Sequence, residues 1–334
     1  MRHFPAYFLL PLLLLLSCGK EHQPGQEETA SPQLTVLIGT DGCGDGCYND
    51  NILSGILSFC EAHPDVQLDL QQPSDLADAG RRLDAWLKAD DSAQRALILA
   101  SNSYEGILQG KAAPENGRVL ILETDESFPG HSSYIIRRYG ASWLCGALSD
   151  GFFPFIVKAM DGNDMIDESA AGFQAGYKHV SGESVLTGTV AGGPEGFAMR
   201  DSTYRFVYKV LKEAEWTAMP LIFPLVGGSI SGVFDYRRYV GFTFVAGMDV
   251  DCTSYAPTSV PFSLMLNNDQ VLERYLEDWL AGKDWPAHET FGLESEYVQV
   301  KLNPSFRWGD LDLPALYAQY YSSAVEKENA YAVE

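Results

Sequence analysis

The sequence predicts an α/β protein whose two halves each contain a parallel sheet flanked by helices. Short apolar runs rich in β-branched residues alternate with segments of helical periodicity along the first half of the chain. The same alternation resumes near residue 184. The 334 residues also suffice for two domains, each with a sizeable core.

The expected elements follow one another in strand–helix order. In the first half, strands are expected at 34–39, 66–70, 95–100 and 118–122, helices at 49–59 and 77–87, and a glycine-rich loop at 40–47. In the second half, strands are expected at 184–190, 218–226 and 239–248, and helices at 204–214, at 268–280 and after Pro314. Such alternation favours parallel sheets covered by helices.

The N-terminus has the order of an export signal, expected at 1–17. Arg2 precedes an apolar run at 4–16, which is shorter than the roughly 20 residues that a spanning helix needs. The segment 15–18 at the end of this run resembles the bacterial lipobox. The cysteine of a lipobox, here Cys18, receives lipid such as palmitate. We therefore expect a lipid anchor at the cell membrane or the outer membrane, outside the cytoplasm. The alternative is a plain signal peptide in which Cys18 is incidental. Residues 18–33 are polar and predict a disordered tether.

Composition and motifs narrow the function classes. The 45 acidic residues outnumber the 23 basic ones, and the net charge of −22 argues against a nucleic-acid partner. The sequence contains no recognisable catalytic or metal-binding motif, so no enzyme activity, cofactor or metal is expected, and the body is expected to be a monomer. Apart from Cys18, an odd number of cysteines remains, and their pairing stays open: Cys43, Cys47, Cys60, Cys145 and Cys252.

Polar residues gather where the expected strands end. In open α/β sheets, ligands bind beyond the carboxyl ends of the strands. Carboxylates there can accept hydrogen bonds from vicinal hydroxyls, and an aromatic ring can stack on a flat heterocycle. The alternative is that these residues cap helices and form turns. The candidates are Asp45, Tyr48, Asn49, Asn102, Glu123, Asp125, Gly228, Asp249 and Asp251.

Five short segments, in order, resemble one family: the basic membrane proteins, which are purine-nucleoside-receptor-like substrate-binding lipoproteins of ABC transporters. The segments are 45–49 with Gly55, 139–146, 172–176, 227–232 and 248–251. The resemblance covers residues 34–302. It implies the type I periplasmic-binding fold, with two Rossmann-like lobes joined by a hinge of three crossings. Lobe 1 is expected at 34–135 and 253–285, lobe 2 at 136–252 and 286–310, and a helical tail at 311–334.

The resemblance also implies roles for the candidate residues. Tyr48 would stack on a nucleoside base, with Phe197 as a second aromatic from the other lobe. Asn49 and either Glu123 or Asp125 would address the edge of the base. Gly228 and either Asp249 or Asp251 would bind the sugar hydroxyls.

The implied function is capture of a nucleoside-like solute for an ABC permease in the membrane. The sequence departs from the family pattern at Leu266, where a lysine is common, and at Cys47 and Cys252, which adjoin ligand positions. These departures keep a second function open: a ligand-sensing or surface lipoprotein that retains the fold but not transport.

Overall fold

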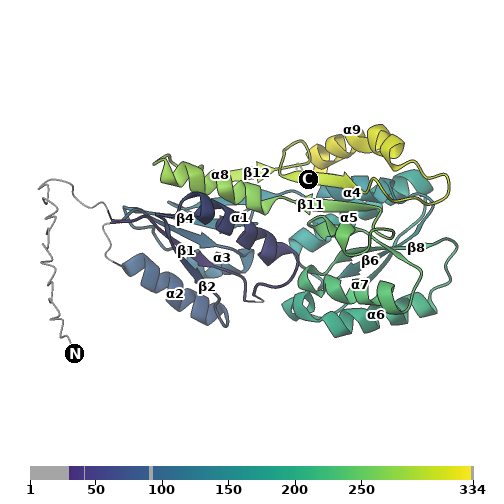
Figure 1. Ribbon diagram of the computed structural model, residues 1–334, viewed down its shortest axis with the longest axis horizontal. Helices are drawn as coiled ribbons and strands as arrows, with labels where there is room; N and C mark the ends of the chain where they lie inside the picture. Colours follow the sequence, from purple (N-terminus) through teal and green to yellow (C-terminus); the bar gives the residue numbers. More distant parts are fainter. Residues whose placement is uncertain (1–29, 41, 90–92, 332–334) are drawn as a thin grey trace, which may run out of the picture.

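The computed structural model describes residues 30–331 except 41 and 90–92 (Figure 1). The expected signal segment, Cys18 and the tether up to residue 29 therefore lie outside the described residues. The tether was expected to reach residue 33, but Gln33 already begins the first strand. Over the described part of the chain, no helix combines the length and the apolar character that crossing a membrane requires.

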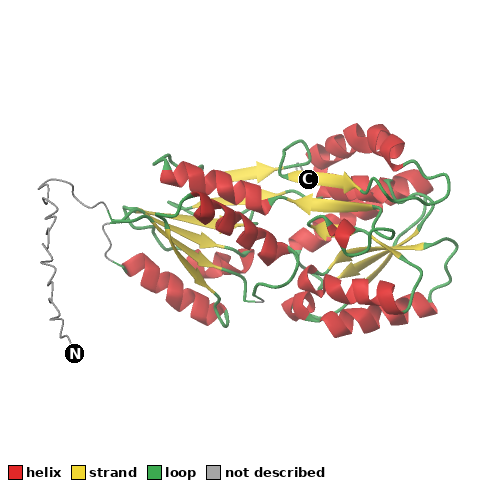
Figure 2. Ribbon diagram, in the orientation of Figure 1, coloured by secondary structure: helices red, strands yellow, loops and turns green. Residues whose placement is uncertain are grey.

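Lobe 1 is built on a parallel sheet with helices on both faces (Figure 2). Within the described residues the strand order is β12-β5-β4-β3-β1-β2. The strands are β1 (Gln33–Leu37), β2 (Gln67–Gln71), β3 (Arg95–Leu99), β4 (Gly117–Leu122), β5 (Ser132–Ile136) and β12 (His288–Phe291). Helices α1 (Tyr48–Ala62) and α8 (Asn268–Leu280) pack together on one face, and α2 (Leu76–Lys88) and α3 (Glu105–Leu108) lie on the other. Every residue of β3 and β5 is buried, as expected for strands covered on both faces.

Lobe 2 repeats this architecture around a second parallel sheet. The described strands follow the order β7-β6-β8-β9, and a smaller sheet of order β10-β11-β13 lies beside them. The strands are β6 (Phe153–Lys158), β7 (Leu186–Thr189), β8 (Pro220–Leu225), β9 (Phe244–Val245), β10 (Gly247–Asp249), β11 (Phe262–Leu266) and β13 (Val298–Leu302). The helices are α4 (Tyr139–Ala147), α5 (Asp164–Ser181), α6 (Arg200–Glu213) and α7 (Ile230–Tyr239). The terminal helix α9 (Leu313–Tyr331) packs on α4.

The chain passes between the lobes at three places in the described structure: after β5, between β11 and α8, and between β12 and β13. The first crossing follows Ile136, the last residue of β5, and the boundary was expected at residue 136. The other two differ from expectation. β11 pairs with β10 and β13, so lobe 2 extends past the expected boundary at residue 253. β12 pairs with β5, so lobe 1 extends past the expected boundary at residue 285.

The expected strand at 239–248 is wrong in its first part. Tyr239 is the last residue of α7, and the backbone forms only the short strands β9 and β10 farther on. The apolar side chains that suggested a buried strand are exposed at this point, with Phe242 at 80% and Tyr239 at 70%. Apolar character alone therefore misplaced the strand, because these residues belong to a helix end and a surface turn.

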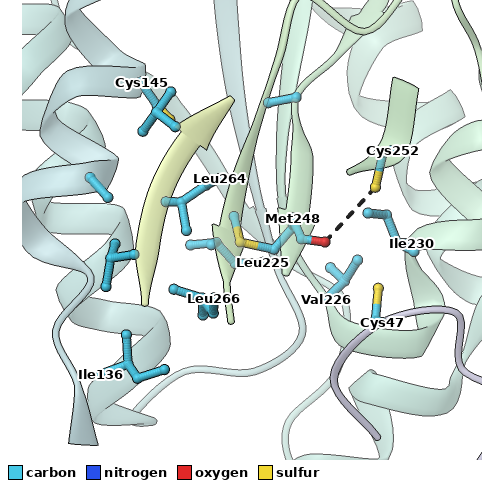
Figure 3. Close-up of a cluster of buried hydrophobic side chains, with 14 of the residues drawn as sticks. Cys47, Ile136, Cys145, Leu225, Val226, Ile230, Met248, Cys252, Leu264 and Leu266 are labelled. Carbon is cyan, nitrogen blue, oxygen red and sulfur yellow. Dashed lines mark hydrogen bonds between the residues drawn. The ribbon is translucent and has the colours of Figure 1, made fainter. Parts of the chain in front are cut away.

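One cluster of buried side chains runs through both lobes (Figure 3). Cys47, from the loop before α1, lies in this cluster with Val226, Ile230 and Cys252 of lobe 2. Leu266, which stands where the family commonly has lysine, is 1% exposed and packs in the same cluster. In the described structure no disulfide joins Cys43, Cys47, Cys60, Cys145 or Cys252. The lobes therefore meet in part through apolar contacts between buried side chains.

Candidate functional site

The loop before α1 is organised by two carboxylates, Asp45 in the loop and Asp50 in the first turn of α1. Asp45 accepts hydrogen bonds from the backbone amides of Cys47 at 2.9 Å, Asn49 at 2.9 Å and Asp50 at 3.1 Å. Asp50 in turn accepts from the amides of Gly44 and Gly46, both at 2.7 Å. The carboxylate of Asp45 thus accepts hydrogen bonds from first-turn amides of α1, as a helix-capping residue does. For Asp45 the structure supports the capping alternative.

This loop rests directly on lobe 2. A Cβ atom added at Gly228 would lie 2.9 Å from Cβ of Asp45, so the approach leaves no room for a side chain. The Tyr255 hydroxyl donates to the carbonyl of Gly46 at 3.4 Å. Phe197 lies beside the same turn, with a ring carbon 3.0 Å from the Cβ position of Gly227. The structure therefore brings Asp45, Phe197 and Gly228 together from opposite lobes.

A buried ion pair lies at the carboxyl ends of β4 and β5. The guanidinium of Arg138 donates to Oε2 of Glu123 at 2.6 Å and to the carbonyl of Ile136 at 2.6 Å. The Glu123 side chain is fully buried, and its Oε1 has no hydrogen-bond partner in the described part of the chain. Burial alone would lower the pKa of Arg138, but the charge and hydrogen bond of Glu123 outweigh it and raise that pKa. Arg138 therefore stays charged, and Oε1 of Glu123 is left as an acceptor for a ligand.

Asp249, at the end of β10 in lobe 2, interacts electrostatically with this pair. Burial raises the pKa of Asp249 to about 7, and the charges of Asp45 and Glu123 add to the rise while Arg138 opposes it. Asp45, Glu123 and Arg138 therefore all lie within electrostatic range of Asp249, in the region between the lobes. The region holds more acceptors than donors, so it suits a ligand rich in hydrogen-bond donors.

The backbone is strained at the two acids of this site. Among the described residues, Glu123 with φ 62° and Asp249 with φ 66° are the non-glycine residues with positive φ. At Asp249 the amide of Val250 closes a three-residue turn on the carbonyl of Met248 at 2.8 Å. Such conformations cost on the order of 1–3 kcal/mol each and gather at functional sites. Their coincidence at two strand ends, one in each lobe, marks this region as the candidate site.

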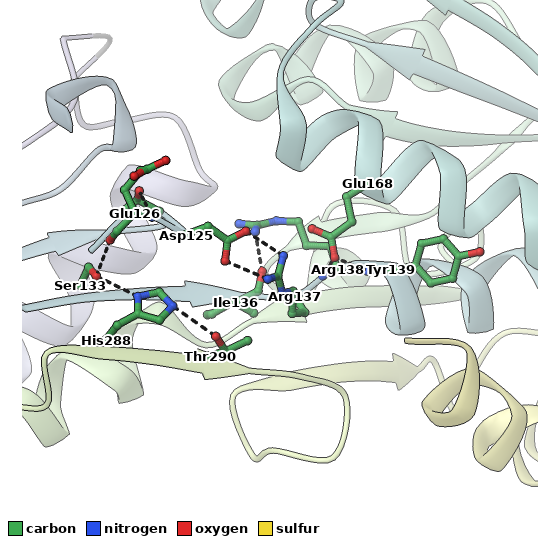
Figure 4. A network of polar contacts seen from close by, with 11 residues as sticks. Asp125, Glu126, Ser133, Ile136, Arg137, Arg138, Tyr139, Glu168, His288 and Thr290 are labelled. Atoms are coloured by element: carbon green, nitrogen blue, oxygen red, sulfur yellow. Dashed lines mark hydrogen bonds and ion pairs between the residues drawn. The ribbon is translucent and has the colours of Figure 1, made fainter. Parts of the chain in front are cut away.

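Three other candidates take no part in the interactions described above. Asp125 is exposed and forms a two-pronged ion pair with Arg137, at 2.8 and 2.9 Å (Figure 4). Asp251 accepts from the amide of Thr253 at 2.9 Å and pairs with Lys301 at 2.8 Å. Asn102 begins a short 3-10 helix, η1 (Asn102–Tyr104), after β3. The geometry therefore favours Glu123 over Asp125, and Asp249 over Asp251.

The aromatic candidate Tyr48 lies half-buried at the start of α1, beside buried Asn49. Tyr48 is close enough to influence the pKa of Tyr134, which burial raises well above its usual value. The Tyr134 hydroxyl donates to the side-chain carbonyl of Asn268 at 2.8 Å. Tyr48 and Phe197 thus offer one ring from each lobe near the acids.

Arg138 is the residue that the sequence-based reasoning missed. It follows β5, a strand that was not expected because two serines begin its sequence, Ser132-Ser133-Tyr134-Ile135-Ile136. The signal that could have located it is an Arg137-Arg138 pair directly after a β-branched run, at a strand's carboxyl end.

The raised pKa of Asp249 predicts that the free energy of unfolding of the ligand-free protein depends on pH. Because the folded-state pKa of about 7 exceeds the unfolded value near 4, the stability that Asp249 contributes is present below about pH 4. It is lost as the pH rises through 7. Asp249→Asn, which keeps a residue tolerant of positive φ, should therefore gain stability relative to wild type between pH 5 and pH 8. Urea unfolding at both pH values measures the difference.

Asp251→Asn is the matched control. Burial alone would raise the pKa of Asp251, but hydrogen bonds from Lys301 and Thr253 outweigh it and hold that pKa below its usual value. Its contribution is therefore present above the unfolded pKa and is lost only in acid. The stability difference between wild type and this variant should stay constant from pH 5 to pH 8. Equal pH profiles for the two variants would contradict the placement of Asp249.

Two surface hollows lie elsewhere. One, of about 310 Å³, is lined by residues that include Gln94, Asn116 and Trp279, and the other, of about 790 Å³, by residues that include Pro32, His63 and Gln94. Both adjoin residues just before β1 or β3, away from the carboxyl ends of those strands, and neither touches Glu123, Arg138 or Asp249. The chemistry of the strand-end cluster, rather than hollow size, therefore identifies the candidate site.

Comparison with known proteins shows the fold. No protein-family model matches the chain, and no curated protein matches it. Among solved structures, a solute-binding protein of an ABC transporter system from Aeropyrum pernix K1 is 16% identical, with a TM-score of 0.67, over 89% of this chain and 86% of that one. An ABC transporter periplasmic solute binding protein from Actinobacillus succinogenes 130z with bound D-allose is 11% identical, with a TM-score of 0.61, over 81% and 98%.

A transcriptional activator of the comK gene from Bacillus halodurans is also similar, at 13% identity and a TM-score of 0.63, over 89% and 97% of the two chains. Transport proteins and regulators therefore share this architecture, and the likeness identifies the fold rather than the activity. The expected fold class is confirmed: the chain has the type I periplasmic-binding-protein fold, with parallel sheets in two lobes.

Proposed function

We propose that this chain is a substrate-binding lipoprotein that captures a small polar solute, a nucleoside, between its lobes and delivers it to an ABC permease. The observation that carries the proposal is the buried Glu123–Arg138 pair in electrostatic range of Asp249 from the other lobe, with strained backbone at both acids. Solved proteins of this fold include solute-binding components of ABC transporters, which supports the same role.

The site chemistry fits a ligand with vicinal hydroxyls. Oε1 of Glu123 and the carboxyl group of Asp249 can both accept hydrogen bonds. Because the pKa of Asp249 is about 7, this group is mostly charged at pH 8, where it accepts the stronger, charge-assisted kind. A ribose presents adjacent hydroxyl donors to such a pair. Tyr48 and Phe197 supply rings from opposite lobes for the two faces of a base. Asn49 is our candidate for the edge of the base.

The anchor and the permease complete the proposal. A lipid on Cys18, joined by a polar tether, would hold the two-lobed body near its membrane partner. One acyl chain binds membranes only marginally, so durable anchoring needs more than one. Incorporation of labelled palmitate that disappears in Cys18→Ser is the expected result.

A ligand panel tests the proposed function. Purified protein is heated with nucleosides, free bases and monosaccharides, including D-allose because one structural neighbour carries it. A nucleoside at 100 times its Kd should stabilise the protein by about 2.7 kcal/mol, seen as a rise in Tm. If only monosaccharides stabilise the protein, the bound solute is a sugar rather than a nucleoside. No rise with any compound would remove the solute-binding proposal.

Ligand sensing without transport is a second candidate. It is favoured by α9, which contacts chain segments at two of the lobe crossings and could report closure to a partner. Loss of uptake of the bound solute in a deletion strain would support transport. Unchanged uptake, with binding intact, would support sensing.

A further inference from the structure

The C-terminal helix α9 is fastened to the N-terminus of α4. A Cβ atom added at Gly140 would lie 2.7 Å from Cβ of Glu328, so the two helices touch where the glycine leaves space. The rings of Tyr139 and Tyr331 stack with their centroids 4.0 Å apart. The last turns of α9 therefore lie directly beside the first crossing between the lobes.

One carboxylate of α9 joins two crossings. Oε1 of Glu328 accepts from the amide of Gly140 at 3.1 Å, just after the first crossing. Its Oε2 accepts from the amide of Leu293 at 2.6 Å, in the third crossing. Glu328 is 6% exposed, and burial raises its pKa although both hydrogen bonds oppose the rise. A buried carboxylate whose two oxygens each hold a different crossing acts as a bridge between them.

The same stretch of backbone carries the ion-paired arginine of the site. The amides of Arg138 and Tyr139 donate to Oε1 of Glu168, from α5, at 2.9 and 3.0 Å (Figure 4). Helix α4 has no side-chain cap of its own, so Glu168 and Glu328 supply acceptors for its first amides. Because these residues are consecutive, the bonds that hold Tyr139 and Gly140 also fix the backbone from which Arg138 reaches Glu123.

We propose that Glu328 is a positioning residue: by bridging the first and third crossings it sets the separation of the lobes and orients Arg138 toward Glu123. The effect on ligand binding rests on the proposed function, whereas the effect on lobe separation does not. Helix α9 is then part of the hinge and not a passive tail.

The test compares Glu328→Gln with Glu326→Gln in the full chain. Glutamine has one acceptor oxygen, so at position 328 its amide group would face an N–H donor and one crossing would lose its bond. Glu326 lies on the same helix but is exposed, and its substitution removes the same charge. Tyr331→Ala, which loosens the end of α9 without leaving a buried polar group, is a second variant in case the first does not fold.

Two measurements on ligand-free protein decide the proposal. Amide exchange in peptides containing Gly140 and Leu293 should rise on the order of tenfold in Glu328→Gln, and X-ray scattering should show a changed radius of gyration. Tyr331→Ala should change both in the same direction by less, and Glu326→Gln should match wild type. Exchange and scattering equal to those of Glu326→Gln overturn the proposal. Faster exchange at an unchanged radius also overturns it, because Glu328 would then only cap a helix.

A ligand from the panel adds a third measurement. Its affinity should fall on the order of tenfold in Glu328→Gln, and the fall should vanish when Arg138 is also replaced by methionine. Additive losses would mean that Glu328 does not act through Arg138. If wild type binds no panel compound, the proposed function fails, while exchange and scattering still decide the role of Glu328.

Discussion

Replacing Arg138 by methionine is expected to destabilise the protein by about 3–5 kcal/mol, because it leaves the carboxylate of Glu123 buried without its cation. Both partners are buried, at 8% and 0% side-chain exposure, and Arg138 also donates to the carbonyl of Ile136. Urea unfolding at pH 7 measures the change in the free energy of unfolding.

The neighbouring Arg137→Met is the matched control. Arg137 pairs with Asp125, whose side chain is 52% exposed, and exposed pairs contribute about 0–1 kcal/mol. A second arm combines Arg138→Met with Glu123→Gln, which removes the stranded charge and should restore most of the lost stability. Equal losses in the two single arginine variants, or no recovery in the double variant, would contradict the buried-pair account.

Gly176→Ala is expected to destabilise the protein by about 3 kcal/mol or more, at the upper end of overpacking. Its Cβ atom would lie 1.9 Å from the backbone carbonyl oxygen of Trp143, so a backbone rather than a flexible side chain must move. Gly146 and Gly172 make similarly close contacts between α4 and α5. The alanine would therefore force two buried helices apart. A fall in Tm, measured by calorimetry, is the expected result.

Gly106→Ala controls for the loss of glycine itself. Gly106 lies in α3, and an added Cβ atom would meet nothing within 4 Å. Alanine there should be neutral or stabilise by about 0.5–1 kcal/mol, through helix propensity and a less flexible unfolded chain. If Gly176→Ala changed Tm no more than Gly106→Ala does, the close packing of α4 on α5 would be wrong.

The glycine segments that suggested the family resemblance thus have a packing explanation. Gly140, Gly146, Gly172 and Gly176 lie where α4 meets α9 or α5 at backbone distance. The sequence could predict that glycine was needed, but not whether a ligand or another helix approached it. The family itself stays a prediction, and the structure accounts for two of its segments through helix packing alone.

The polar residues at the ends of the expected strands included the acids of the site but not Arg138, their cation. Glu123 and Asp249 follow strands that could be predicted from their apolar runs, although Asp249 ends a much shorter strand than expected. Arg138 follows a strand that begins with two serines, and β12 contains His288 and Glu289, so neither strand has a continuous apolar pattern. Strands that are stabilised by tertiary burial rather than by their own composition cannot be predicted from an apolar pattern. Because β5 and β12 lie next to lobe crossings, missing them also misplaced the lobe boundaries.

The central claim is that Glu123, Arg138 and Asp249 form the solute-binding site between the lobes. Calorimetric titration of the tightest panel ligand into wild type, Asp249→Asn and Asp125→Asn tests this claim most directly. At pH 8, where Asp249 is mostly charged, Asp249→Asn is expected to weaken binding on the order of tenfold or more, since a charged acceptor becomes neutral, while the exposed Asp125→Asn leaves Kd within twofold. Equal affinity in wild type and Asp249→Asn, or no binding heat from any compound, would contradict it.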